Sequence, residues 1–233
     1  MNRWVLVLLS VAASSMVYQF LVITALTYIL GDGLVLFCVF TGVFMSAMGL
    51  GAYLAGECRK THEFFVRSQL VLAVSGFAIL PVIFSLYSVI MARHFQSGGE
   101  SAWLMSVVMW PIGLAAEILF GTLLGMQLPL LQQITKDGVR KDMTLSKFLA
   151  LDYVGSFLGA AAFPLILFPM LGMFRTAFAA ALLNTIMAGV SVFGNERGKV
   201  KYFVFLAALS AGIVFSFFHS SELETFFDAI VYG

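Results

Sequence analysis

Two carboxylates lie inside long apolar runs, and they are the residues best placed to do chemistry. Asp152 falls in the stretch 149–172, which reads LALDYVGSFLGAAAFPLILFPMLG, and Glu117 falls near the middle of the apolar run 102–133. An acidic side chain at the centre of a membrane helix costs about 2.5–3.5 kcal/mol on insertion scales, so it faces the protein interior and marks a functional site. We therefore expect both acids to point into a helix bundle, with Asp152 just below the membrane interface.

Each acid has a structural and a functional interpretation. Asp152 follows Lys147 by about 8 Å along a helix, so it pairs with that lysine or another loop cation, hydrogen-bonds to a second helix, or binds a cation or proton. Its helical face continues through small residues, which predicts that it points at a packing seam rather than at lipid. Glu117 either has a binding or proton-linked role or makes a buried hydrogen bond between helices. The sequence leaves these alternatives open.

Uncharged polar side chains in the apolar runs complete the candidate ligand-binding set. These are Tyr18, Gln19, Gln127 and Tyr153. Gln19 is predicted at the depth of Glu117, and Gln127 lies deeper toward the cytoplasm. Amides in membrane bundles also join helices by hydrogen bonds, and this structural role is the alternative for both glutamines and for Asn184.

Several classes of function are excluded by the sequence. No Gly-rich strand-to-helix motif, Ser-His-Asp set or paired carboxylates occur, so we expect no catalytic residue and no cofactor. No Cys/His spacing suits a metal, and Cys38 and Cys58 are about 30 Å apart on one predicted helix, too far for a disulfide. The net charge of +1 does not indicate the basic surface that nucleic-acid-binding proteins carry.

The elements that position these residues are predicted to be membrane helices. The chain is 61% hydrophobic and 11% charged, whereas soluble domains carry about 25% charged residues. Apolar runs separated by polar breaks predict an all-α membrane protein of seven transmembrane helices. Their expected ranges are 4–30, 34–56, 64–92, 102–133, 146–170, 174–193 and 199–219.

The loop charges predict an orientation. Of the 13 Lys and Arg residues, only Arg93 and Arg175 fall at one side, and the other eleven fall at the side that includes the N-terminus. Positive loops stay in the cytoplasm, so the N-terminus is predicted inside and, after seven spans, the C-terminus outside. Residues 1–219 would form the membrane domain, and 220–233 a short amphipathic tail or a linker to a further domain.

Small residues at helical spacing predict close packing between helices. The pairs Gly121/Gly125 and Gly155/Gly159 are each one turn apart. The run 34–56 adds small residues at spacing four, which are Ala47, Gly51 and Ala55. The alternative for these glycines is a hinge or a substrate path.

Three blocks of sequence resemble a known family. They are SMVYQFLVITALTYILGDG at 15–33, GVFMSAMGLGAYLAG at 42–56, and LGMQLPLL at 124–131 followed by 149–184. These blocks resemble the membrane domain that precedes, or is fused to, bacterial spermidine synthase-like aminopropyltransferases. That domain is similar to half of a major-facilitator transporter, so the resemblance implies a three-plus-three inverted helix arrangement with one added helix, in the bacterial inner membrane.

The resemblance also bears on the site. Asp152 matches the family's aspartate, whereas Gln19 and Gln127 stand where the family typically has glutamate. The resemblance therefore implies a multi-pass domain that binds or translocates a small, cationic, polyamine-like metabolite. The alternative is a membrane anchor or scaffold for a synthase domain or for a partner membrane subunit. An integral-membrane enzyme is a third hypothesis that no motif supports.

Overall fold

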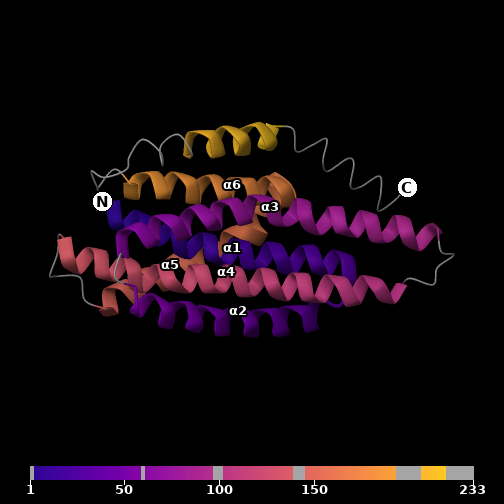
Figure 1. Ribbon diagram of the computed structural model, residues 1–233, viewed down its shortest axis with the longest axis horizontal. Helices are drawn as coiled ribbons and strands as arrows, with labels where there is room; N and C mark the ends of the chain where they lie inside the picture. The colour runs from indigo at the N-terminus through magenta and orange to yellow at the C-terminus, as the bar shows by residue number, and fades with distance from the viewer. Residues whose placement is uncertain (1–2, 59–60, 97–101, 139–144, 193–205, 219–233) are drawn as a thin grey trace.

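The computed structural model describes residues 3–58, 61–96, 102–138, 145–192 and 206–218, and this part of the chain is helical apart from short turns (Figure 1). Its elements are α1 (Arg3–Leu30), α2 (Gly33–Gly56), α3 (Thr61–Gln96), α4 (Ala102–Gly138), α5 (Leu145–Ala162), the π-helical turn η1 (Phe163–Leu167) and α6 (Phe168–Val192). A shorter apolar helix spans Leu206–Phe218. The all-α prediction is confirmed for the described residues.

Five segments within the described ranges are long and apolar enough to cross a membrane: Trp4–Leu30, Gly33–Gly56, Thr61–His94, Trp103–Thr135 and Leu145–Val192. Helices α3 and α4 extend beyond the expected 64–92 and 102–133. The prediction ended them where polar residues begin, but a helix continues as long as its backbone hydrogen bonds do. The predicted tail at 220–233 lies outside the described residues.

The fifth segment contains a sharp break at Gly172. Its φ of 73° and ψ of −176° are not helical, and glycine adopts a positive φ at little cost because it has no Cβ. The Thr176 hydroxyl donates to the Leu167 and Gly172 carbonyls, with O···O distances of 3.1 and 2.6 Å, and so caps the break. The expected boundary between 146–170 and 174–193 falls at this residue.

Contacts along α6 show that it runs antiparallel to α3. Phe174 at its start packs against Phe84, with ring centroids 5.3 Å apart, and Phe178 packs against Phe77 at 5.1 Å. Ala188 near its end clusters with Val66 near the start of α3.

Helix α3 runs parallel to α1, because both are antiparallel to α4. Helix α5 also runs parallel to α1, because Gly155 lies against Leu9 and Gly159 against Ala13. The chain therefore reverses direction between α5 and α6, at Gly172.

Two seams of small residues hold the bundle together, as the spacing predicted. Gly51 of α2 lies against the backbone of Thr122, and Gly125 of α4 lies against the backbone of Met48. Gly155 and Gly159 of α5 lie against α1 in the same way. Because a glycine has no side chain, the paired backbones approach closely, and this fixes α2 on α4 and α5 on α1.

The bundle is elongated, with the helices running roughly along its long axis (Figure 1). Helix α2 lies at one edge, and the Leu206–Phe218 helix, drawn in yellow, lies beside α6 at the opposite edge. Helix α1 is central and packs against α2, α4, α5 and α6. Its position explains why most of its apolar side chains are buried, while α2 exposes one whole apolar face.

Candidate functional site: a cleft bordered by Asp152 and a buried polar layer

The structure places the predicted site residues in two separate regions. Gln127, Asp152 and Tyr153 line one cleft. Tyr18, Gln19 and Glu117 lie deeper in the bundle and are fully or nearly fully buried. Ten residues of α4 separate Glu117 from Gln127, which corresponds to roughly 15 Å along the helix. The candidate residues therefore belong to two structural features.

The cleft has a volume of about 300 Å³ and lies between α1, α2, α4 and α5, with Phe65 of α3 also in its wall. This volume is at the lower end of the range of about 300–1,000 Å³ found for small-molecule pockets. Its walls include Leu8 and Val11 near the start of α1 and Gly49 and Ala52 near the end of α2. The cleft thus lies toward the end of the bundle where the sequence places most cationic residues.

Asp152 lies on the face of α5 that meets α1, as predicted. Phe148, Gly155 and Gly159 share this face and are buried, whereas Asp152 is half-buried because its side chain borders the cleft. Within the described residues, its carboxylate has no hydrogen-bond or ion-pair partner.

The pairing with Lys147 considered from the sequence is absent from the described interactions of Asp152. The helix geometry explains the difference. Five residues advance a helix by about 140°, so the two side chains leave α5 in different directions. A carboxylate that no cation of the described residues neutralises, at the border of a cleft, can bind a positive group from outside the chain.

Gln127 forms part of the cleft wall from α4, and its partner is Gln69 of α3. Gln69 Nε2 donates to Gln127 Oε1 at an N···O distance of 2.8 Å. Both side chains are fully buried, and in the part of the chain that the structure describes this bond leaves Gln127 Nε2 and Gln69 Oε1 without partners. Sequence reasoning missed Gln69, although an amide between the apolar residues of 64–92 was a signal that could have found it.

Tyr153 follows Asp152 on α5 and lies at the opening of the cleft. It is 69% exposed, because successive residues of a helix point about 100° apart. Tyr153 borders the cleft without being enclosed by it.

Tyr18 is the centre of the buried layer and joins four helices. Its ring stacks on Phe120 of α4, with centroids 5.0 Å apart and planes 5° apart, and it lies against Gly76 of α3. Asn184 Nδ2 of α6 donates to its hydroxyl at 3.1 Å, and the Ser14 hydroxyl donates to Asn184 Oδ1 at 3.2 Å. These contacts show a structural role between helices for Tyr18 and Asn184.

Gln19 also makes an interhelical bond, and Glu117 does not. Gln19 Nε2 donates to the Thr41 hydroxyl of α2 at 3.0 Å. Glu117 is fully buried, and neither of its oxygens has a hydrogen-bond partner in the described part of the chain. It lies one turn from Gly113, which faces Phe40, and one turn from Gly121, which faces Phe44, so it is at the level of the Gln19–Thr41 bond.

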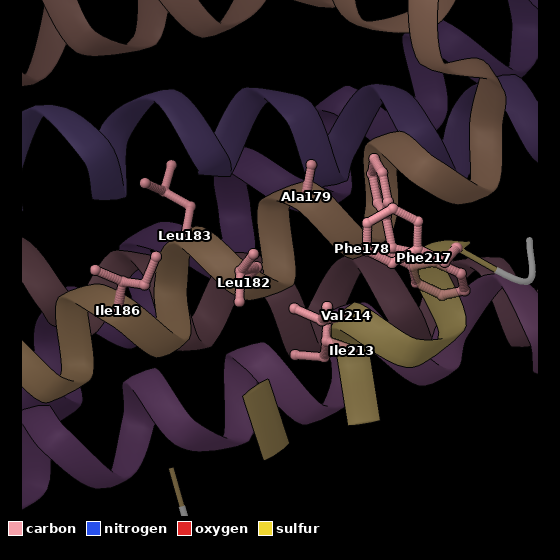
Figure 2. A pocket seen from close by; sticks show the side chains of 9 residues that line it. Phe178, Ala179, Leu182, Leu183, Ile186, Ile213, Val214 and Phe217 are labelled. Carbon is pink, nitrogen blue, oxygen red and sulfur yellow. The ribbon is translucent and has the colours of Figure 1, made fainter. Parts of the chain in front are cut away.

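A second hollow, of about 460 Å³, lies between α6 and the Leu206–Phe218 helix (Figure 2). All nine of its lining side chains are apolar, and they include Phe178, Leu182, Ile213 and Phe217. An apolar wall cannot compensate a buried charge, so this groove does not suit a cationic ligand.

Comparisons with known proteins give homologues for most of the chain. A polyamine aminopropyltransferase of Corynebacterium efficiens is 32% identical over 196 residues, and one of Leptospira interrogans is 29% identical over 188 residues; each match covers 80% of this chain and 34% of the relative. Polyamine aminopropyltransferase 2 of Ralstonia nicotianae is 28% identical over 98% of this chain and 45% of its own length.

The homologues of this chain are therefore polyamine aminopropyltransferases, and the chain spans about a third to under a half of the length of these three. No family model matches the chain, and no solved structure matches it.

Proposed function

We propose that this chain is a multi-spanning domain of the bacterial inner membrane that binds or translocates a small cationic metabolite of the polyamine type. The observation that carries the proposal is the half-buried Asp152 carboxylate, which borders a cleft and has no partner among the described residues. Gln127 adds a hydrogen-bonding group to the same cleft. The names of the homologues, which refer to polyamines, agree with a cationic ligand.

The pairing of the helices supports an arrangement like half of a major-facilitator transporter. If α1, α2 and α3 are taken as equivalent to α4, α5 and α6, the α1–α5 contact corresponds to α4–α2, and the α1–α6 contact corresponds to α4–α3. All four contacts are observed. This equivalence also turns α1–α2 into the smaller α4–α5 contact and leaves α1–α4 and α3–α6 unchanged. Among the described residues, the small α1–α3 contact has no counterpart of similar extent. Two inverted repeats of three helices produce such an exchange.

The same arrangement supports seven crossings. The segment Leu145–Val192 has 48 residues, about 70 Å as a straight helix, which is more than twice the thickness of a hydrocarbon core of about 30 Å. Because the chain reverses at Gly172, we propose that it crosses twice, and that the Leu206–Phe218 helix belongs to the seventh span. The cleft would then face the cytoplasm.

The alternative function is a membrane anchor or scaffold, and one observation favours it. Three glycines at spacing seven, Gly42, Gly49 and Gly56, are exposed on α2, and Gly49 also borders the cleft. A Cβ added to any of them would meet no atom within 4 Å. Small residues on an exposed face allow another helix to approach, so this face would suit a partner membrane subunit.

The test is binding of a radiolabelled polyamine to the purified chain in lipid nanodiscs. We expect saturable binding that Asp152→Asn weakens at least tenfold, because the neutral amide cannot compensate an ammonium group. Asp32→Asn is the matched control, since it removes an exposed carboxylate at the far end of α1 and α2, roughly 30 Å from the cleft.

The same variants then report flux in sealed vesicles, which separates binding from transport. Equal binding by wild type and Asp152→Asn, or no binding at all, would contradict the proposal and leave the scaffold.

A further inference from the structure

The second feature of the cleft is a fully buried amide with an unused hydrogen-bonding atom. Gln127 is completely inaccessible to solvent and lines the cleft, and no described residue bonds to its Nε2 atom. A buried polar group without a hydrogen bond costs about 1–3 kcal/mol, so such groups are rare unless something outside the chain satisfies them.

Gln69 fixes the orientation of the Gln127 amide. Its bond to Gln127, at 2.8 Å, uses one polar atom of each side chain and leaves the other atom of each unpaired. Rotating Gln127 alone would bring two donors together, whereas rotating both amides restores the bond in the opposite sense. The pair can therefore offer the cleft either an N–H donor or a carbonyl acceptor, and one state changes to the other only when both amides rotate.

We propose that Gln127, positioned by Gln69, is the second ligand anchor of the cleft, and that the ligand is a small amine with a second polar group several carbons from its ammonium. This inference rests on the proposed function, in which Asp152 binds the ammonium group. A diamine would use the carbonyl state of the pair, and an amino alcohol would use either state. A simple alkylamine would leave the amide unsatisfied, because its far end is a methyl group.

The experiment measures how well butylamine, 4-amino-1-butanol and 1,4-diaminobutane compete with the radiolabelled polyamine for binding to the chain in nanodiscs. For the wild type we expect the two bifunctional amines to bind roughly tenfold more tightly than butylamine. Tenfold corresponds to about 1.4 kcal/mol, the scale of one hydrogen bond.

The decisive variant carries both Gln69→Leu and Gln127→Leu. Replacing both partners of a buried hydrogen bond by apolar groups is close to neutral for stability, so this variant should fold where a single substitution would leave the other amide unpaired. We expect it to bind all three amines with similar affinity and to retain the butylamine affinity of the wild type. Gln127→Glu, which adds a second carboxylate, should favour 1,4-diaminobutane over 4-amino-1-butanol.

A control separates ligand selection from loss of a buried polar group. Thr185→Val removes a buried hydroxyl of α6 that bonds only within its own helix, and it should keep the wild-type preference. If all three amines bind equally to the wild type, or the double variant keeps the preference, the second anchor is refuted while the Asp152 site stands. If no amine binds in an Asp152-dependent way, both proposals fail.

Discussion

The sharpest test of the packing compares two alanine substitutions on α2. Gly51→Ala places a Cβ within 3.0 Å of the Thr122 carbonyl oxygen of α4, a separation that Cβ atoms essentially never show. Gly42→Ala places its Cβ on the same helix with no atom within 4 Å. We expect Gly51→Ala to destabilise the chain and Gly42→Ala to leave it unchanged or slightly more stable.

The expected difference in the free energy of unfolding between the two variants is worked out by removing what the two substitutions share. Both gain helix propensity of about 1 kcal/mol, and this gain cancels in the comparison. Gly51→Ala must also move α2 away from α4 by more than 0.4 Å, because its Cβ would lie less than 3.0 Å from the α4 backbone and ordinary van der Waals contact begins at 3.4 Å. Overpacking costs about 1–3 kcal/mol, and we expect the upper part of this range because the obstructing atom is backbone and cannot rotate away.

The assay is reversible unfolding in bicelles, followed by steric trapping, which gives a free energy of unfolding for each variant. The predicted difference between Gly51→Ala and Gly42→Ala is about 2–3 kcal/mol, from the same overpacking range. Gly125→Ala should behave like Gly51→Ala, because its Cβ would meet the Met48 backbone. A Gly51→Ala variant within roughly 0.5 kcal/mol of Gly42→Ala, the usual scatter of surface substitutions, would refute the close α2–α4 seam.

Two further predictions concern the buried acid and the topology. Glu117→Met should raise the free energy of unfolding by about 1–3 kcal/mol, because it removes a buried carboxyl group that has no partner among the described residues. Gln19→Met should lower the free energy of unfolding by about 1 kcal/mol, because the bond to Thr41 is lost. A destabilising Glu117→Met would show that the carboxyl group has a favourable interaction. Alkaline phosphatase fused after Phe218 should be active and a fusion after Gly56 inactive, since seven crossings place these ends on opposite sides; the reverse result would overturn the orientation.

The sequence predicted the seams and the break near Gly172 because both depend on local information, whereas α3 and α4 extend beyond their expected ends. Small residues four apart share one face of a helix, so Gly121 and Gly125 had to lie together. The break near Gly172 followed from the end of an apolar run, although its positive φ is a property that only coordinates show.

Contacts between distant parts of the chain could not be read in this way. Asn184 bonds to Tyr18 across 166 positions, and Gln69 bonds to Gln127 across 58. Such pairs are selected by how whole helices pack, and many polar residues occur at suitable depths. The missing Asp152–Lys147 pair was predictable, since the angle between positions on a helix follows from their spacing alone.

The cleft and the buried layer differ more in whether their polar groups have hydrogen-bond partners than in the types of residue they contain. In the buried layer Tyr18, Gln19 and Asn184 bond to other helices, so substituting them would affect packing first. In the cleft Asp152 and Gln127 keep polar atoms that no described residue satisfies. Glu117 of the layer also lacks partners among the described residues, but it is fully buried and does not line the cleft. A ligand gains hydrogen bonds and ion pairs most readily from unsatisfied polar groups that border a cleft, which is why we propose binding in the cleft and cohesion in the layer.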